Sequence, residues 1–120
     1  MSASSKSSSQ SSETELLVVL CTVPDKVCAE RIAARLVNER FAACVNIIPG
    51  IESVYEWQGK IERDREVLLL IKTPPSAFDS LQQKLVQLHP YDTPEVIGVP
   101  VELGLQDYLS WARQAVSTPS

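Results

Sequence analysis

Basic clusters are the first thing missing from this chain of 120 residues, in which 11 Lys and Arg are outnumbered by 15 Asp and Glu. The formal net charge is −4, and the basic side chains stand among acidic ones, as in KIERDREV at positions 60–67. Proteins that bind nucleic acids usually carry a basic stripe that neutralises phosphates. We therefore expect no nucleic-acid partner, and we interpret the charged run Glu62–Glu66 as a solvated face.

Long hydrophobic runs are missing too. The apolar run LLVVLCTV, which starts at Leu16, is far shorter than the roughly 20 residues that cross a membrane. A secretory signal is disfavoured because domain-like sequence follows this run at once. We expect no membrane partner.

Paired cysteines are absent as well. The chain has three cysteines, Cys21, Cys28 and Cys44, without C-x-x-C spacing. An odd number without that spacing argues against a disulfide framework and against a structural zinc site. Because reduced thiols fit a reducing compartment, the expected location is cytoplasmic.

Recognisable catalytic signatures are missing in turn, since the sequence offers no Ser-His-Asp, paired-carboxylate or phosphate-loop arrangement. The segment Thr22–Asp25 lacks the glycine and arginine that acyl-phosphate chemistry needs. The apolar segments LLVVLCT and VLLLIKT, which read as central strands, lack the stacking aromatic side chains of RNA-recognition modules. The sequence therefore predicts a protein that is not an enzyme.

Serine dominates the N-terminal segment that is present. Residues 1–14 hold eight serines, and their apolar surface is too small to offset the entropy lost on ordering. We predict a disordered tail at residues 1–14 and a single domain at residues 15–118.

The rest of the sequence alternates strand-like and helix-like patterns. Runs of β-forming apolar residues mark strands, and apolar residues at i, i+3, i+4 and i+7 mark amphipathic helices. The expected elements are strands at 16–23, 44–58, 60–73 and 96–103 and helices at 25–40, at 76–88 and after Gly104. This order, βαββαβα, predicts an α+β fold: a ferredoxin-like sandwich with an antiparallel sheet and an added C-terminal helix.

Two of the expected helices carry signals for their first turn. Asp25 is a candidate N-cap for the first helix, because its carboxylate can accept a hydrogen bond from a free backbone N–H. Ser76 followed by Asp79 resembles a capping box for the second helix.

The two middle strands form a hairpin that is too long for its domain. An extended strand over Cys44–Gln58 reaches about 50 Å, whereas a body of this size is roughly 33 Å across. Pro49-Gly50 predicts a bulge within the strand, and Gly59 predicts the turn. The hairpin is therefore expected to project as an arm.

An arm that overhangs its domain needs something to pack against, and a second copy of the chain is the simplest partner. Tyr55 and Trp57 share one face of the expected arm. Because aromatic side chains are enriched where proteins meet, both are predicted interface residues.

Four segments carry a family resemblance: LCTVPD at 20–25, the hairpin block at 42–73, HPYDTPEVIGVPV at 89–101 and YLSWA at 108–112. Together they resemble the CutA family of divalent-cation tolerance proteins. The most specific residues are those of the hairpin, namely Asn46, Pro49, Gly50, Tyr55, Trp57 and Gly59. The resemblance implies a ferredoxin-like subunit, a homotrimer with hairpin arms that reach across subunits, and a role in tolerance of divalent metals, copper above all.

The resemblance also implies a metal site. Cys21 matches a cysteine proposed as a copper ligand in relatives, and Glu95 matches a proposed carboxylate. The histidine proposed in a relative falls at Leu88 here, so His89 would have to replace it. A thiolate, an imidazole and a carboxylate together suit copper or another divalent transition metal.

Each of these three residues also has a structural interpretation. Cys21 fits the core of a buried strand. His89 can bond a backbone carbonyl near a helix end. Glu95 can pair with a lysine or line a cleft between subunits.

The function expected from the sequence is that of a non-enzymatic homotrimer that binds a divalent metal or a small ligand and takes part in the response to metal ions. The alternative is a signalling or scaffold trimer similar to PII proteins, which share the subunit fold and bind ligands between subunits. Lys72 and Tyr91 are further candidates for lining such a ligand cleft.

Overall fold

Four strands form one antiparallel sheet within residues 14–116, the part of the chain that the computed structural model describes. They are β2 (Leu17–Val23), β3 (Cys44–Trp57), β4 (Lys60–Thr73) and β5 (Ile97–Pro100). The spatial order is β3-β4-β2-β5, and every pairing is antiparallel. This order confirms the predicted ferredoxin-like α+β fold. The predicted tail at 1–14 lies, apart from Thr14, outside the described residues.

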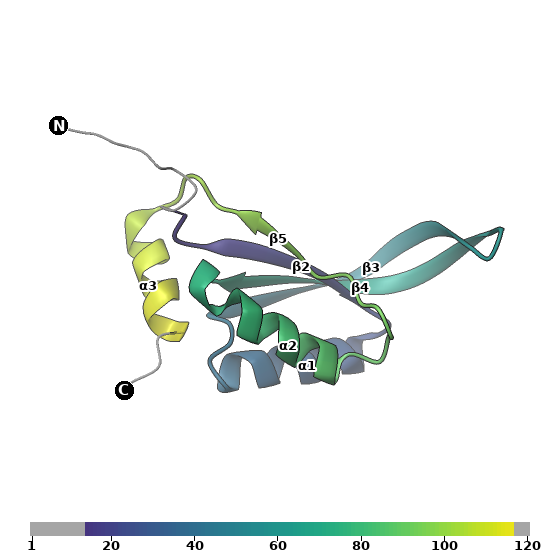
Figure 1. Cartoon of the computed structure of the whole chain (residues 1–120), viewed down its shortest axis with the longest axis horizontal. Coiled ribbons are helices and arrows are strands. Elements are labelled where there is room, and N and C mark those ends of the chain that lie inside the picture. Colours follow the sequence, from purple (N-terminus) through teal and green to yellow (C-terminus); the bar gives the residue numbers. More distant parts are fainter. Residues whose placement is uncertain (1–13, 117–120) are drawn as a thin grey trace.

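Helices α1 (Lys26–Asn38) and α2 (Phe78–Leu88) lie together on one face of the sheet (Figure 1). Their apolar stripes pack on the strand residues of one parity, because successive side chains of a strand point to opposite faces. The core between helices and sheet consists of Val19, Cys21, Val23, Cys28, Ala29, Ile32, Leu36, Ala42, Val67, Leu69, Ile71, Leu81 and Leu85.

The helix ends confirm one of the two capping predictions. The Asp25 carboxylate accepts a hydrogen bond of 2.8 Å from the backbone N–H of Cys28, as expected for an N-cap. The predicted capping box is wrong: a 3-10 turn, η2 (Pro75–Ala77), comes before α2, and no side-chain hydrogen bond caps that helix. Prolines restrict the backbone there to geometries that suit the first turn of a helix.

Two elements end earlier than predicted. The first helix was expected to reach Arg40, but α1 ends at Asn38 and Arg40 has a positive φ of 65°. The last strand was expected over 96–103, but β5 stops at Pro100, whose nitrogen has no hydrogen to donate to the sheet.

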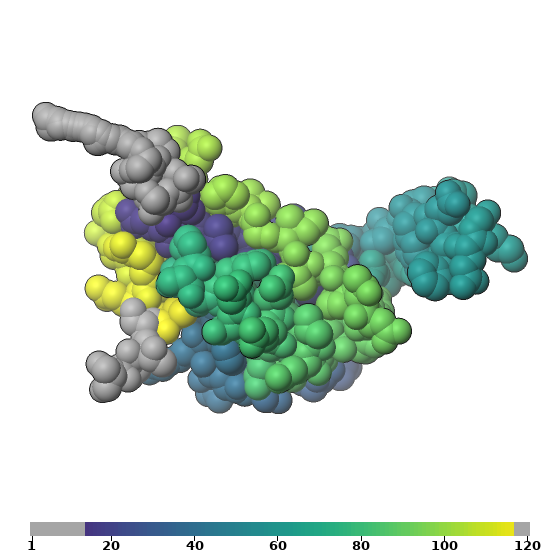
Figure 2. Space-filling model, viewed as in Figure 1, coloured from purple at the N-terminus to yellow at the C-terminus, as the bar shows by residue number. Residues whose placement is uncertain are grey.

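The hairpin of β3 and β4 projects from the body as a separate lobe (Figures 1 and 2). The two strands pair from Cys44↔Lys72 to Trp57↔Lys60, with one register shift between Ile48 and Ile51. The shift confirms the bulge predicted at Pro49-Gly50. Pairing of β4 with β2 ends at Val67, so the hairpin beyond that point is the arm. The longest dimension of the molecule is 56 Å.

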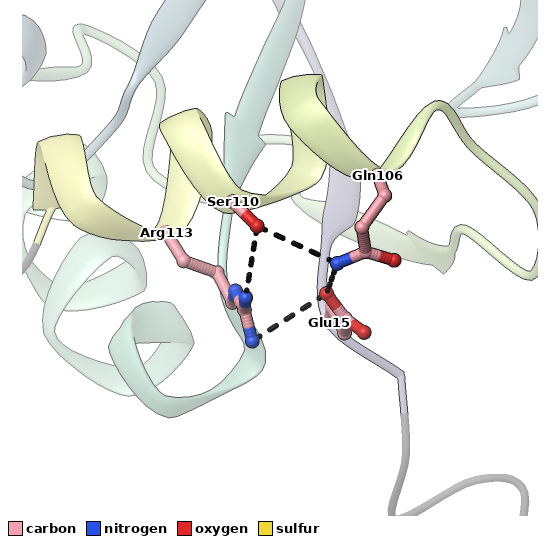
Figure 3. Close-up of polar contacts among 4 residues, drawn as sticks. All are labelled: Glu15, Gln106, Ser110 and Arg113. Carbon is pink, nitrogen blue, oxygen red and sulfur yellow. Dashed lines mark hydrogen bonds and ion pairs between the residues drawn. The ribbon is translucent and has the colours of Figure 1, made fainter.

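Helix α3 (Gln106–Val116) lies at the end of the sheet far from the arm (Figure 1). The Gln106 amide nitrogen donates to the Glu15 carboxylate at 3.5 Å and to Ser110 Oγ at 3.4 Å, and Arg113 forms an ion pair of 3.4 Å with Glu15 (Figure 3). A second small core joins this helix to the sheet through Leu16, Ala43, Leu109, Ala112 and Val116.

Candidate functional site

A cavity of about 530 Å³ lies where the arm leaves the body. The end of β2, both strands of the arm and the loop after α2 contribute side chains. The lining residues are Thr22, Tyr55, Trp57, Glu62, Asp64, Glu66, Tyr91, Asp92, Thr93 and Glu95. Five of them are carboxylic acids, three are aromatic, and none is a Lys or Arg. The cavity is therefore suited to positively charged ligands.

The arm supplies half of this lining from a single face. Glu62, Asp64 and Glu66 alternate along β4, so their side chains share one face. Tyr55 lies opposite Glu62 in the register, which places it and Trp57 on the same face. The Tyr55 hydroxyl donates a hydrogen bond to the Asp64 carboxylate, and this bond raises the pKa of Tyr55 to about 12.

Glu66 lies at the base of the arm and is 8% exposed. It stands opposite Ile51, directly after the bulge. The Tyr91 hydroxyl donates to Glu66 Oε2 at 2.8 Å, and burial, followed by this bond, raises the pKa of Tyr91. No Lys or Arg within residues 14–116 forms an ion pair with Glu66. A buried carboxylate thus faces the cavity without a positive partner from the described chain.

His89 is buried and held by two backbone groups. Its Nε2 lies 2.7 Å from the Thr22 carbonyl oxygen, and the Tyr91 backbone N–H lies 3.1 Å from its Nδ1. A carbonyl only accepts and a backbone N–H only donates, so Nε2 carries the proton and Nδ1 accepts. Both ring nitrogens are therefore occupied.

Cys21 is fully buried in the core between sheet and helices. Burial, followed by the negative charge of Glu95, raises the pKa of its thiol to about 12. Metals bind the thiolate rather than the thiol, so a metal at Cys21 would have to displace a firmly held proton.

The predicted metal ligands meet in one region but do not form a site. Cys21 precedes Thr22 in the sequence, and His89 is bonded to the Thr22 carbonyl. Glu95 lines the same cavity as Thr22. Glu95 alone is exposed to a ligand. Within the described range 14–116, no group of three or more His, Cys, Asp or Glu is placed to hold a metal ion. The copper site of the thiolate–imidazole–carboxylate kind that the resemblance implies therefore stays a prediction.

The other predicted site residues divide between two places. Tyr55, Trp57 and Tyr91 line the cavity. Lys72 does not, because it lies on β4 at the opposite end of the sheet from the arm and donates a hydrogen bond to the Asn46 side chain.

The acidic face of the arm was missed by the sequence analysis. Interpretation of Glu62–Glu66 as a solvated face is wrong for Glu66, which is buried. Arg63 and Arg65 alternate with the three acidic residues and offset two of their charges, so the run as a whole has a net charge of only −1. The acidic face could have been predicted from the occurrence of acidic residues at every second position, because this spacing puts three carboxylates on one face of a strand.

Residues 17–115 match the protein family described as CutA1 divalent ion tolerance protein. The chain belongs to this family. The divalent-cation tolerance protein CutA of Thermus thermophilus is 50% identical over 97 residues, which cover 81% of this CutA1 chain and 94% of the relative. The protein of the same name from Pectobacterium atrosepticum is 48% identical over 102 residues, 85% of this chain and 93% of the relative. These comparisons confirm the resemblance seen in the sequence.

Solved structures show the same fold. The crystal structure of CutA1 from Oryza sativa matches with a TM-score of 0.84 and 45% sequence identity, covering 87% of this chain and 95% of that chain. No helix in the described part of this CutA1 chain is long and apolar enough to cross a membrane.

Proposed function

We propose that this CutA1 protein contributes to divalent-cation tolerance by binding cations at the acidic cavity under the arm, without catalysing a reaction. The observation that carries the proposal is the lining of that cavity, with five carboxylic acids and no Lys or Arg. Carboxylates gathered at a concave surface raise the local concentration of cations. The names of the relatives, which refer to divalent-cation tolerance, agree with this role.

The chemistry of the lining bears on the metal. Oxygen ligands favour ions such as Mn²⁺, whereas copper(I) prefers thiolates. Cys21 is a buried thiol and His89 has no free nitrogen, so oxygen atoms are what the cavity offers. We infer that divalent ions, copper(II) among them, are held mainly through charge.

The absence of catalysis is part of the proposal. His89 is the single histidine of the chain, and both of its ring nitrogens bond backbone groups. General acid–base catalysis needs a group free to exchange a proton with the substrate.

The three cysteines are free, which supports a reducing compartment such as the cytoplasm.

A homotrimer is the proposed assembly, and the uncovered face of the sheet supports it. Helices α1 and α2 cover the other face, whereas Leu20, paired with Leu70 and Ile97, lies on the uncovered one. Ile97 and Val99 are 51% and 44% exposed. Apolar side chains on a sheet face are expected to be covered by another surface, and copies of the chain can supply it.

Calorimetric titration with Cu²⁺, Zn²⁺ and Mn²⁺ tests the metal proposal. The double variant Asp92→Asn/Glu95→Gln removes two charges from the exposed loop and should weaken binding severalfold. Cys21→Ala and His89→Ala should bind like the parent protein. Glu30→Gln, which removes one charge from the exposed surface of α1, is a control for net charge.

Two results would contradict the proposal. Unchanged binding in the Asp92/Glu95 variant would remove the cavity as the cation site. Loss of binding in Cys21→Ala would instead favour the thiolate site predicted from the sequence.

A further inference from the structure

The cavity under the arm is lined by aromatic side chains as well as carboxylates. Carboxylates are ligands for a divalent metal ion, but the aromatic rings are not. We propose that the cavity binds a small organic cation that carries a guanidinium or primary ammonium group. This inference goes beyond metal tolerance but concerns the same cavity, and it is argued from two features that the metal proposal does not use: the burial and bonding of Glu66, and the three aromatic rings.

Glu66 supplies the first observation. Its side chain is buried, with 8% exposed, and it lines the cavity. Tyr91 bonds Oε2, and no residue within 14–116 donates a hydrogen bond to Oε1. A buried carboxylate is costly unless a positive group or enough hydrogen bonds compensate it. One neutral hydroxyl leaves Oε1 available to an N–H donor from a ligand.

The aromatic residues supply the second observation. The face of an aromatic ring carries partial negative charge and attracts ammonium and guanidinium groups. In the single chain Trp57 is 61% exposed and Tyr55 is 43% exposed, so the face of the arm that is predicted to lie at the subunit interface also lines the cavity. The hydroxyls of Tyr55 and Tyr91 bond Asp64 and Glu66, which fixes both rings beside the carboxylates. Rings held next to carboxylates form a binding surface that is prepared for an organic cation.

The size and charge of the cavity restrict the ligand further. Small-molecule sites have volumes of roughly 300–1,000 Å³, and the volume of about 530 Å³ lies within this range. Acidic or neutral metabolites find no positive side chain in the lining. A planar guanidinium can stack on a ring and donate two parallel hydrogen bonds to a carboxylate, so it matches both features.

The test compares butylguanidinium with butylurea, which has a similar shape but no charge. The chain has two tryptophans. The substitution Trp111→Phe therefore leaves Trp57, which lines the cavity, as the only indole fluorophore of the chain. Titration of the full chain should quench or shift the Trp57 emission with butylguanidinium and leave it unchanged with butylurea at the same concentrations.

Two variants link the ligand to the proposed contacts. Glu66→Gln keeps an oxygen to accept from Tyr91 but removes the charge, so binding should weaken at least tenfold while the melting temperature stays equal or rises. Tyr91→Phe should weaken binding less. Glu30→Gln, on the exposed surface of α1, should bind like the parent.

Equal binding of the two probes, equal affinity in Glu66→Gln, or no binding of butylguanidinium at millimolar concentration would overturn the inference. The result is independent of the metal titration. Loss of metal binding in the Asp92/Glu95 variant does not require loss of guanidinium binding, and the reverse also holds.

Discussion

At the scale of the residue, two side chains with reactive chemistry have structural roles in this chain. The sequence analysis left both interpretations of His89 open, and the structure contains the bond to a backbone carbonyl that one of them describes. Cys21 is a core residue as its apolar strand suggested. Glu66 departs most from expectation: it was interpreted as part of a solvated face, but it is buried. Whether one acid of a charged run is buried depends on the segments that pack over it, which the run itself does not specify.

Cys21 should make the protein sensitive to alkaline pH. Burial raises the thiol pKa from 9.0 to about 12, so the folded chain keeps this proton more firmly than the unfolded chain does. The stabilisation is fully present below pH 9 and is lost as the pH rises toward 12. Thermal unfolding measured across this range should show a shallower fall in melting temperature for Cys21→Ala than for the parent.

Tyrosines whose pKa values are also raised contribute to the same alkaline range, so the comparison rests on the difference between variants. Cys44→Ala, at a half-buried cysteine outside the main core, is the matched control and should follow the parent. Parallel curves for Cys21→Ala and the parent would contradict the assigned role of the buried thiol.

At the scale of the element, the arm follows from local sequence signals. Alternating residues predict its strands, Pro49-Gly50 predicts the bulge, and Gly59 predicts the turn. The turn in the structure has positive φ at both central residues, 51° at Gln58 and 80° at Gly59. Two positive φ values in a row are typical of a type I′ turn, whose twist suits a hairpin.

This turn gives a prediction with opposite signs at neighbouring positions. Gly59→Ala places a side chain at a positive φ and should lower the free energy of unfolding by about 1 kcal/mol. Gln58→Asn places a residue that tolerates this conformation at the other position and should raise it by roughly 0.5 kcal/mol. Urea unfolding at one fixed protein concentration measures both effects.

A fixed concentration matters because unfolding of an oligomer depends on it. If Gln58→Asn destabilised the protein as much as Gly59→Ala, the conformation assigned to the turn would be wrong.

At the scale of the whole molecule, the arm and the uncovered sheet face favour assembly. The radius of gyration is 16.3 Å, compared with about 13 Å for a compact chain of 100 residues. Val54 and Ile61, on the arm, are 54% and 67% exposed. A monomer would leave these surfaces in contact with water.

Light scattering should therefore give about three times the chain mass of 13.2 kDa. The double variant Val54→Asp/Ile61→Asp puts charges on the arm and should shift the protein toward smaller species. Val27→Asp is the control, because Val27 is 77% exposed on α1, on the body. A parent protein that runs as a clean monomer would contradict the proposed trimer.

The sequence by itself determined the elements, the fold class, the bulge and the length of the arm, because these depend on residue periodicity and on local turn chemistry. Only the tertiary structure decided the composition of the cavity. Glu66 meets Tyr91, and Thr22 meets His89, across long sequence separations. The bulge also shifts β3 by one residue against β4, which sets the face on which Tyr55 lies. Side chains from distant segments make the site, and which of them meet is not contained in any local pattern.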